Sequence, residues 1–168
     1  LSDYRLVVAP MLYMLSPESA ARMEDFVRKG GTLVCTYLTG LVDQSDLCHE
    51  GGAPGPLRET LGLRVSESDA LPGGADQSLV LGDPDQGSGA FAVRHYADVL
   101  VLEGAMSMGV YGKDFMAGSP AFTIKHHGKG DAWYIGARTD DSFLESFYRS
   151  LTRKLNLSRA CGHPLPPG

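Results

Sequence analysis

Short apolar runs flank a helical pattern in the first forty residues of the chain. The run YRLVVAP at 4–10 is nearly continuous and rich in branched residues, which predicts a strand covered on both faces in a parallel sheet. A helix should follow, because Ser16 fits its N-cap, Pro17 its first position and Gly30 the left-handed residue at its end. The second run, TLVCTYL at 32–38, completes a β-α-β unit with parallel strands.

The second half of the chain carries strand patterns with no helix between them. The segments SLVLG, FAVRHY, DVLVLEG and MGVYG predict short antiparallel strands attached to the parallel sheet. AFTIKHHGKGDAWYIGA predicts a hairpin whose turn is built by Gly128, Lys129 and Gly130. SFLESFYRSLTRKL predicts a closing amphipathic helix with Asp140 or Asp141 near its cap. The pattern as a whole therefore indicates an α/β domain.

Composition narrows the classes of partner. At 168 residues, the chain has the size of one domain, and folding hides about 70% of the surface of its extended form. The formal net charge is -5 and the basic residues are scattered, so neither nucleic acid nor membrane lipid is an expected partner. The apolar runs are far shorter than the roughly 20 residues that span a bilayer. Three cysteines without a CxxC spacing argue against a disulfide framework and favour a reducing cytoplasm.

Metal chemistry has little support in the sequence. His126 and His127 are neighbours in a predicted strand, so their side chains point to opposite faces and do not bind one metal together. The run Cys48, His49 and Glu50 lacks a fourth ligand at a suitable spacing. We therefore expect neither a metal nor a cofactor.

Three pieces of the chain resemble the middle domain of family 42 β-galactosidases. They are LSDYRLVVAPMLYMLS, GGTLVCTYLTGLVDQSDLCHEGGAPGPLRETLG, and AGSPAFTIKHHGKGDAWYIGART with DDSFLESFYRSL. The combination of TY-x-x-G-x-VD, GG-x-PGPLRE-x-LG and GKG-x-AWY-x-G-x-R is specific. The resemblance implies a three-layer α/β/α domain with a mainly parallel sheet and added antiparallel strands, of the class I glutamine-amidotransferase-like (flavodoxin-like) type.

The resemblance also implies a division of labour within a larger bacterial enzyme that hydrolyses terminal β-D-galactosides. Residues 1–160 would form the middle domain, which makes the homotrimer, and the Pro-rich residues 161–168 a linker to a following domain. The catalytic glutamates and any zinc site would lie in a TIM-barrel domain of the same polypeptide, so this chain alone should not be an enzyme. The resemblance further implies a strand-helix-strand section at the start of the family's middle domain, and we expect that section to be absent from this chain.

The polar stretch LVDQSDLCHEGGAPGP follows Gly40 at the carboxyl end of the second predicted strand, where open α/β sheets usually place ligands. In the family it lies near a neighbouring subunit, which would give contacts with a partner or a sugar to Asp43, Asp46, His49 and Arg58. The alternative is an ordinary surface loop ordered by its own Gly and Pro residues.

Two other functions stay open at this stage. The related amidotransferases place a nucleophilic Cys on a sharp turn written G-x-C-x-G, and here Leu38 holds that position while Cys35 lies within the strand. A remnant hydrolase would need a Cys or Ser there with a His in reach. A sugar-binding module would need an aromatic platform in a pocket, for which Tyr37 is the one hint.

Overall fold

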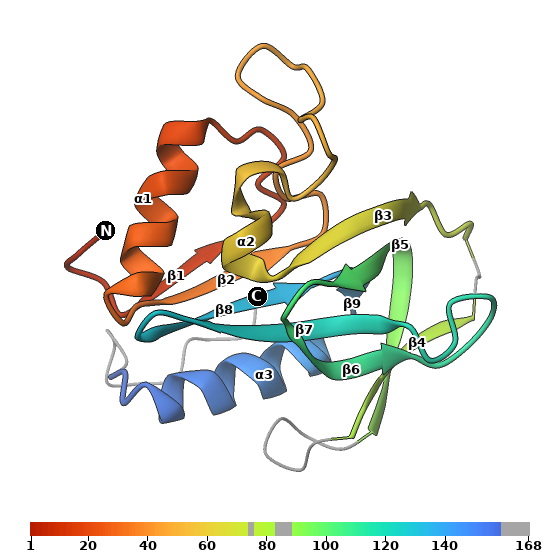
Figure 1. The fold of residues 1–168 in the computed structure, drawn as a ribbon. Helices are drawn as coiled ribbons and strands as arrows, with labels where there is room; N and C mark the ends of the chain where they lie inside the picture. Colours follow the sequence, from red (N-terminus) through yellow and green to blue (C-terminus); the bar gives the residue numbers. More distant parts are fainter. Residues whose placement is uncertain (74–75, 83–88, 159–168) are drawn as a thin grey trace.

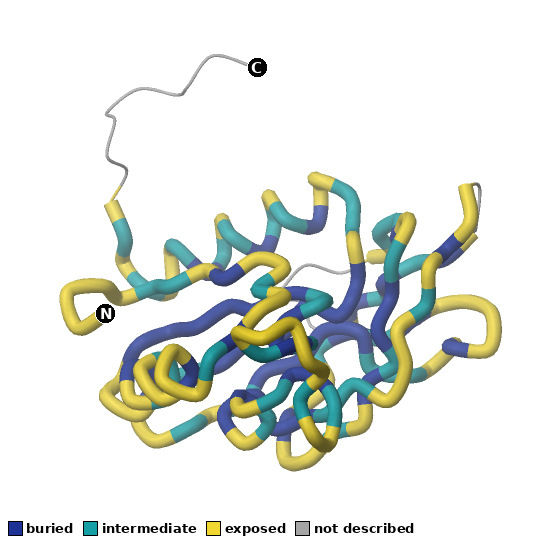
Figure 2. The backbone as a smooth tube through the Cα atoms, turned by 90° about the horizontal axis from the view of Figure 1, so that it is seen from above, coloured by how far each residue is buried: buried dark blue, intermediate teal, exposed yellow. Residues whose placement is uncertain are grey.

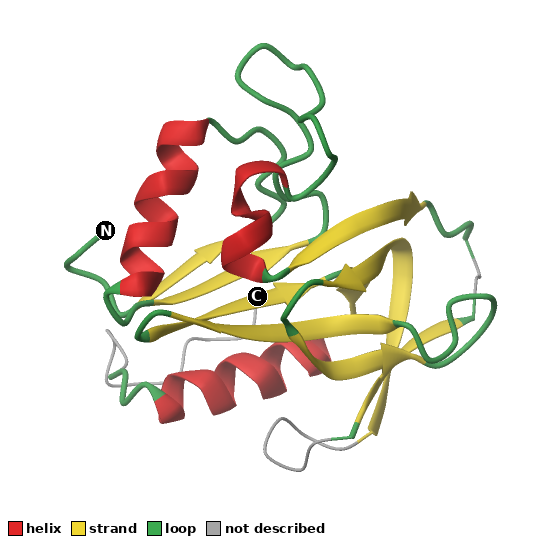
Figure 3. Cartoon of the chain, in the orientation of Figure 1, coloured by secondary structure: helices red, strands yellow, loops and turns green. Residues whose placement is uncertain are grey.

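Two layers of helices enclose a mixed sheet in the computed structural model, which describes residues 1–73, 76–82 and 89–158. Helices α1 (Pro17–Arg28) and α2 (Arg58–Leu61) cover one face, and α3 (Asp141–Lys154) covers the other (Figures 1 and 3). The three-layer α/β arrangement is therefore present. The predicted linker at 161–168 lies outside the described residues.

Within the described residues the sheet contains nine strands in the order β1-β2-β8-β7-β6-β4-β5-β3, with β9 paired to β5. Their bounds are β1 Leu6–Ala9, β2 Thr32–Thr36, β3 Leu63–Asp69, β4 Gln77–Leu81, β5 Gly89–Leu102, β6 Met106–Tyr111, β7 Pro120–His127, β8 Gly130–Ile135 and β9 Ala137–Thr139. A short 3-10 turn, Gly55–Leu57, precedes α2.

The prediction of a mainly parallel sheet is wrong. Strand β2 pairs in parallel with β1 and with β8, whereas the other pairs of named strands are antiparallel. The reason is the connections: α1 is the crossover between β1 and β2, but later neighbours such as β7 and β8 are joined by tight turns, which link antiparallel strands. The parallel part is confined to one end of the sheet.

Strand β1 was expected to be covered on both faces, and this is also wrong. It pairs with β2 alone among the described strands, and the side chain of Val8 is exposed, with 40% of the residue accessible. A short apolar run has the same pattern in a central strand and in an edge strand, because periodicity does not show how many strands pair with it. Strand β2, by contrast, is buried throughout as predicted.

The segments FAVRHY and DVLVLEG form one long strand, β5, instead of two. His95 takes a left-handed φ of 67° in the middle of this strand, and the register of the β5–β9 pair shifts between Val93 and Ala97. The first half of β5 pairs with β4 and the second half with β3. A local irregularity of this kind bends a strand and lets it serve two neighbours.

The predicted helix boundaries are confirmed. The Ser16 hydroxyl accepts the N–H of Ser19 at the start of α1, and Gly30 follows its end with a φ of 112°. Of the two candidates at α3, Asp140 is the cap, since its carboxylate accepts the N–H of Phe143. None of the helices in the described ranges is long and apolar enough to cross a membrane.

Side chains of β8 alternate between the two faces of the sheet, and each face has its own hydrophobic cluster. Trp133 packs with Phe122, Phe143 and Phe147 beneath α3. Tyr134 points the other way and packs with residues of α1 and α2. The buried segments in Figure 2 follow the middle strands, while the outer loops are exposed.

Candidate functional site

A sharp turn follows β2 and contains the position that the amidotransferases give to a nucleophile. Leu38 has a left-handed φ of 65°, which is unusual for a branched apolar residue. Cys35 is fully buried, and burial raises the pKa of its thiol to about 12 although Thr39 hydrogen-bonds to it. A thiol in this state is not a nucleophile at neutral pH. The backbone of an elbow is therefore present without its chemistry.

A buried carboxylate that the sequence did not indicate lies beneath this turn. Asp98 of β5 is 1% exposed, and its carboxylate accepts hydrogen bonds from the Ser68 hydroxyl (2.7 Å) and the Tyr134 hydroxyl (2.7 Å). Burial raises the pKa of Asp98, and the two hydroxyls together with the nearby backbone N–H of Leu38 oppose that rise. The sequence holds one sign of this burial. Because side chains alternate along a strand, Asp98 lies on the same face of β5 as Leu100, which is buried.

The long loop after Gly40 is tied to the segment that follows β1. The N–H of Gly40 donates to the carbonyl of Leu12, and the N–H groups of Leu41 and Val42 both donate to the carbonyl of Tyr13. A side chain at Gly40 would place its Cβ 2.3 Å from the carbonyl oxygen of Pro54, so the loop closes tightly at this glycine. The loop therefore has a defined backbone held by hydrogen bonds beyond its own turns.

The side chains of three of the four predicted contact residues interact with other residues of the chain. One carboxylate oxygen of Asp43 accepts the N–H groups of Ser45 and Leu47, and His49 Nε2 lies 3.0 Å from the carbonyl oxygen of Leu15. Asp43 and His49 therefore shape the loop.

Arg58 is engaged in the same way outside the loop. Its Nε and Nη2 meet the two carboxylate oxygens of Glu103 at 2.6 and 2.5 Å, and this pairing lowers the pKa of Glu103. Asp46 is exposed near the loop tip with a φ of 61°. Asp43, His49 and Arg58 each contact a different part of the chain, and the role of the four residues toward a sugar or a partner stays a prediction.

Exposed apolar side chains gather on the two segments that these hydrogen bonds join. Met11, Tyr13, Met14 and Leu47 are 49, 43, 48 and 65% exposed, and we call them the apolar loop surface. The backbone beneath them is fixed, since Met14 and Val42 form a parallel bridge and Val42 and Cys48 an antiparallel one. The sequence shows this feature as PMLYML, an apolar run too long for an ordinary polar turn.

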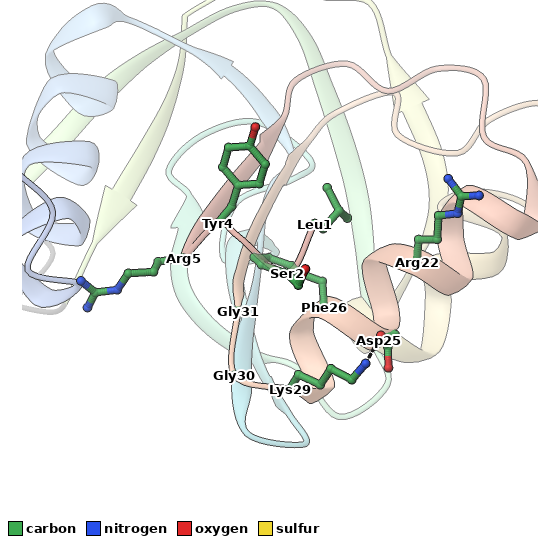
Figure 4. Close-up of a pocket in the computed structure, with 10 residues that line it drawn as sticks. All are labelled: Leu1, Ser2, Tyr4, Arg5, Arg22, Asp25, Phe26, Lys29, Gly30 and Gly31. Carbon is green, nitrogen blue, oxygen red and sulfur yellow. Dashed lines mark hydrogen bonds and ion pairs between the residues drawn. The ribbon is translucent and has the colours of Figure 1, made fainter. Parts of the chain in front are cut away.

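A cavity of about 530 Å³ lies at the other end of β1, between the first residues of the chain and α1 (Figure 4). Phe26 and Tyr4 line it, and Lys29 beside it is paired with Asp25 at 2.7 Å. This is the amino end of the parallel strands, whereas a sugar pocket was expected at the carboxyl ends. Tyr37, the suggested aromatic platform, instead lies against Tyr96 with ring centroids 5.3 Å apart.

The two neighbouring histidines of the β7–β8 hairpin contact different carboxylates. His126 Nδ1 lies 2.5 Å from Asp131 Oδ1, and His127 Nε2 lies 3.4 Å from Glu24 Oε1. In the part of the chain that the structure describes, no three His, Cys, Asp or Glu side chains come together as a metal site would require.

A family model described as the β-galactosidase trimerisation domain matches residues 1–158. The chain belongs to this family. The motifs noted above, from TYLTGLVD to GKGDAWYIGAR, lie within the residues that match the β-galactosidase trimerisation domain.

The relatives of this trimerisation domain are much longer proteins, and the chain matches only a part of each. The chain is 44% identical to β-galactosidase Pbg of Clostridium perfringens over 99% of its own length, and 44% identical to β-galactosidase BglY of Alicyclobacillus acidocaldarius over 100%. It spans 24 and 25% of their lengths, about a quarter in each case.

The fold of this trimerisation domain matches those of solved β-galactosidases. The crystal structure of the β-galactosidase from Rahnella sp. R3 superposes with a TM-score of 0.93 and 40% identity, covering 99% of this chain and 25% of that one. The mixed sheet flanked by helices described above is therefore the fold of this family.

Proposed function

We propose that this chain is the assembly domain of a trimeric β-galactosidase and has no catalytic role of its own. The observation that carries the proposal is the family match over residues 1–158. The turn after β2 supports it, because Leu38 and a buried Cys35 leave no nucleophile there. Catalytic carboxylates and the binding of a terminal β-D-galactoside would then belong to the TIM-barrel domain of the longer polypeptide, as the quarter coverage of the relatives favours.

The surface that we assign to subunit contact is the apolar loop surface. A closed trimer uses a heterologous interface, in which one patch of each subunit meets a different patch of the next. Four large apolar side chains on a fixed backbone suit such a contact, since little conformational entropy is lost when they are buried. In this arrangement Asp43 and His49 hold the loop in shape, and the exposed Asp46 lies at the polar rim.

The free edge of β1 would receive the section that precedes this segment in the family. Among the described strands β1 pairs with β2 alone, so the backbone of its other edge is open to pairing. A further strand at this edge would extend the parallel part of the sheet, and that extension is the feature that would make the fold amidotransferase-like. Residues 1–160 would then be the larger part of the middle domain, with 161–168 as its linker.

A cytoplasmic location also belongs to this proposal. Cys35 and Cys48 are free thiols, and Cys48 is exposed. Exposed thiols persist in reducing compartments.

The test is the solution mass of the 168-residue chain by light scattering coupled to gel filtration, over a wide range of concentrations. We expect a trimer that dissociates when Met11 and Met14 are both changed to Ser. Phe115→Ser is the matched control, because Phe115 is as exposed as Leu47 but lies between β6 and β7.

Three other results would each contradict a different part of this proposal. A monomer at every concentration would overturn the claim that this segment assembles by itself. A trimer that survives the paired loop change but not Phe115→Ser would move the interface to the β6–β7 turn. Hydrolysis of a chromogenic β-galactoside by the purified chain would overturn the non-catalytic assignment.

A further inference from the structure

Three basic side chains surround one carboxylate near the start of β3. The guanidinium of Arg58 donates to both carboxylate oxygens of Glu103, and Arg64 Nε lies 3.7 Å from one of them. Lys125 donates from Nζ to the carbonyl of Glu59 at 2.6 Å, and its charge also acts on Glu103. Three cations therefore stand against two carboxylates, those of Glu103 and the exposed Glu59. We call Arg58, Arg64 and Lys125 the basic patch.

The β3 side of the basic patch faces solvent. The side chains of Arg58 and Arg64 are 41 and 39% exposed. Val101 of β5 is paired with Arg64 in the register of the two strands, so both project to the same face, and Val101 is 36% exposed. Leu63 and Leu100, which alternate with them, belong to the buried cluster. Arg64 and Val101 thus point away from the core and form a surface that is positive and partly apolar.

The loop that carries Leu47 of the apolar loop surface has the opposite charge. Residues 41–50 contain Asp43, Asp46 and Glu50 but neither Lys nor Arg. The carboxylate of Asp43 is occupied by two backbone N–H groups of the loop, whereas Asp46 is exposed near the tip. Charges at the rim of an interface select the partner and fix how it docks. Asp46 is therefore the carboxylate of this loop best placed to meet a cation of another molecule.

Closure of a trimer requires the two contact patches of a subunit to lie on neighbouring sides. In a ring of three, the directions from one subunit to the other two differ by about 60°. The basic patch meets this requirement, because the N–H of Val65 in β3 donates to the carbonyl of Ala53 at the end of the loop (2.8 Å). A Cβ added at Gly51 would lie 3.5 Å from Arg58 Nη1. Figure 1 shows the loop rising next to α2, with α3 across the sheet from both.

We propose that the basic patch of one subunit receives the apolar loop surface of the next, with Asp46 facing Arg64 at the rim. The occupant is a second copy of this chain, because the two surfaces are complementary in charge and lie on neighbouring sides as threefold closure requires. This inference rests on the function proposed above and adds the second half of the interface.

Charge reversal tests the pair by light scattering of the 168-residue chain over a range of concentrations. Asp46→Arg or Arg64→Asp alone should raise the concentration at which the trimer dissociates by about tenfold or more, because each change brings like charges together at all three interfaces. Both changes in one chain should recover most of that loss, since the pair forms again with its signs exchanged.

Asp114→Arg and Arg94→Asp are the matched controls. Asp114 is exposed with a left-handed φ of 60°, as Asp46 is with 61°, and Arg94 is an exposed arginine of β5. Neither control should change the dissociation by more than about twofold, as is usual for isolated surface charges. Near-UV circular dichroism checks that each variant is folded. Reversals no stronger than these controls, or a combined variant weaker than either single change, would overturn the proposal.

Salt provides a test that needs no variant. Raising NaCl from about 50 to about 500 mM should increase dissociation several-fold, because exposed charges are screened over shorter distances. A trimer with the same dissociation at both concentrations would overturn the pairing of charges.

The two proposals fail in different ways. A trimer that is lost when Met11 and Met14 are changed to Ser, but that is indifferent to charge reversal, keeps the apolar loop surface as an interface and overturns the basic patch as its partner. A monomer of the unsubstituted chain at every concentration overturns both.

Discussion

The two faces of the sheet are packed with different kinds of side chain. Beneath α3, aromatic rings pack on one another: Phe122 stacks on Trp133 at 5.2 Å between centroids, and Phe147 meets both edge-on at 5.1 and 5.3 Å. Beneath α1 and α2 the core is mainly aliphatic and contains the carboxylate of Asp98. The first face resembles an ordinary hydrophobic core, and the second is a polar network under a strained turn.

The difference teaches that nonpolar stability and the joining of distant strands come from opposite faces of the sheet. Aromatic pairs bury large areas and add about 0.5–1.5 kcal/mol each beyond that burial, with no polar group left over. The network at Asp98 gives less, since its hydrogen bonds must first offset the removal of a charge from water. It does, however, join β3, β5 and β8 across the sheet.

The largest expected effect is on the α3 face. Phe147→Ala should lower the free energy of unfolding by about 3–5 kcal/mol, because it removes a fully buried ring and leaves a cavity. Urea titration monitored by Trp133 fluorescence checks this value. Leu144→Ala on the same helix is the control and should have a smaller effect, since Leu144 is only partly buried. Equal losses would show that α3 is not anchored by its aromatic side.

On the other face, Tyr134→Phe should lower the free energy of unfolding by about 1–3 kcal/mol, because the buried carboxylate of Asp98 loses one of its donors. Tyr148→Phe removes a hydroxyl from the α3 side and is the matched comparison. If the two changes had the same small effect, the hydrogen bond from Tyr134 would contribute nothing beyond ring packing. Urea titration at pH 7 separates these outcomes.

The α3 face is also the one that the sequence predicts well. Phe143, Phe147 and Leu151 recur at helical spacing, so periodicity alone identifies the buried side of α3. The caps Ser16 and Asp140 follow from local rules as well, because a cap bonds within its own first turn. Local chemistry of this kind is visible in a single sequence.

The strand neighbours and the buried carboxylate depend on contacts between distant segments. The sequence indicates that 4–10 is a strand, but not that β1 lies at an edge, because pairing depends on where β8 returns to the sheet. Asp98 is the first residue of the predicted strand DVLVLEG, and only the bend at His95 joins this segment with FAVRHY into β5. The role of Asp98 is set by residues from β3, β8 and the turn after β2, and spacing does not reveal it.

The N-caps of the two long helices should differ by a smaller amount. Asp140→Ala should lower the free energy of unfolding by about 1–2 kcal/mol, because Asp140 caps α3 and also accepts the N–H of Ala92 in β5. Ser16→Ala should lower it by about 0.5–1 kcal/mol, since Ser16 bonds only within the first turn of α1. Thermal unfolding of both variants in one buffer checks the order. A larger loss for Ser16→Ala would contradict the view that α3 is the better anchored helix.

The smallest expected effect is a difference in how the cost of two substitutions varies with pH. Burial raises the native pKa of Asp98, so between the unfolded value of about 3.9 and that raised value the native state binds more protons. Its contribution to stability is therefore largest below pH 3.9 or so and falls as pH rises through the native pKa. Partial burial acts against Asp140, but hydrogen bonds from Ser142, Phe143 and Ala92 prevail and lower its native pKa.

The Asp140 contribution has the opposite sign: it is present above the unfolded pKa and lost as pH falls through the native one. Urea titrations of Asp98→Asn and Asp140→Asn from pH 3 to pH 8 test this contrast. The cost of Asp98→Asn should shrink as pH rises, whereas that of Asp140→Asn should grow and then level off. Costs that change in the same direction would mean that Asp98 is better solvated than its position between β3 and β8 implies, and the contrast between the two faces would lose its electrostatic basis.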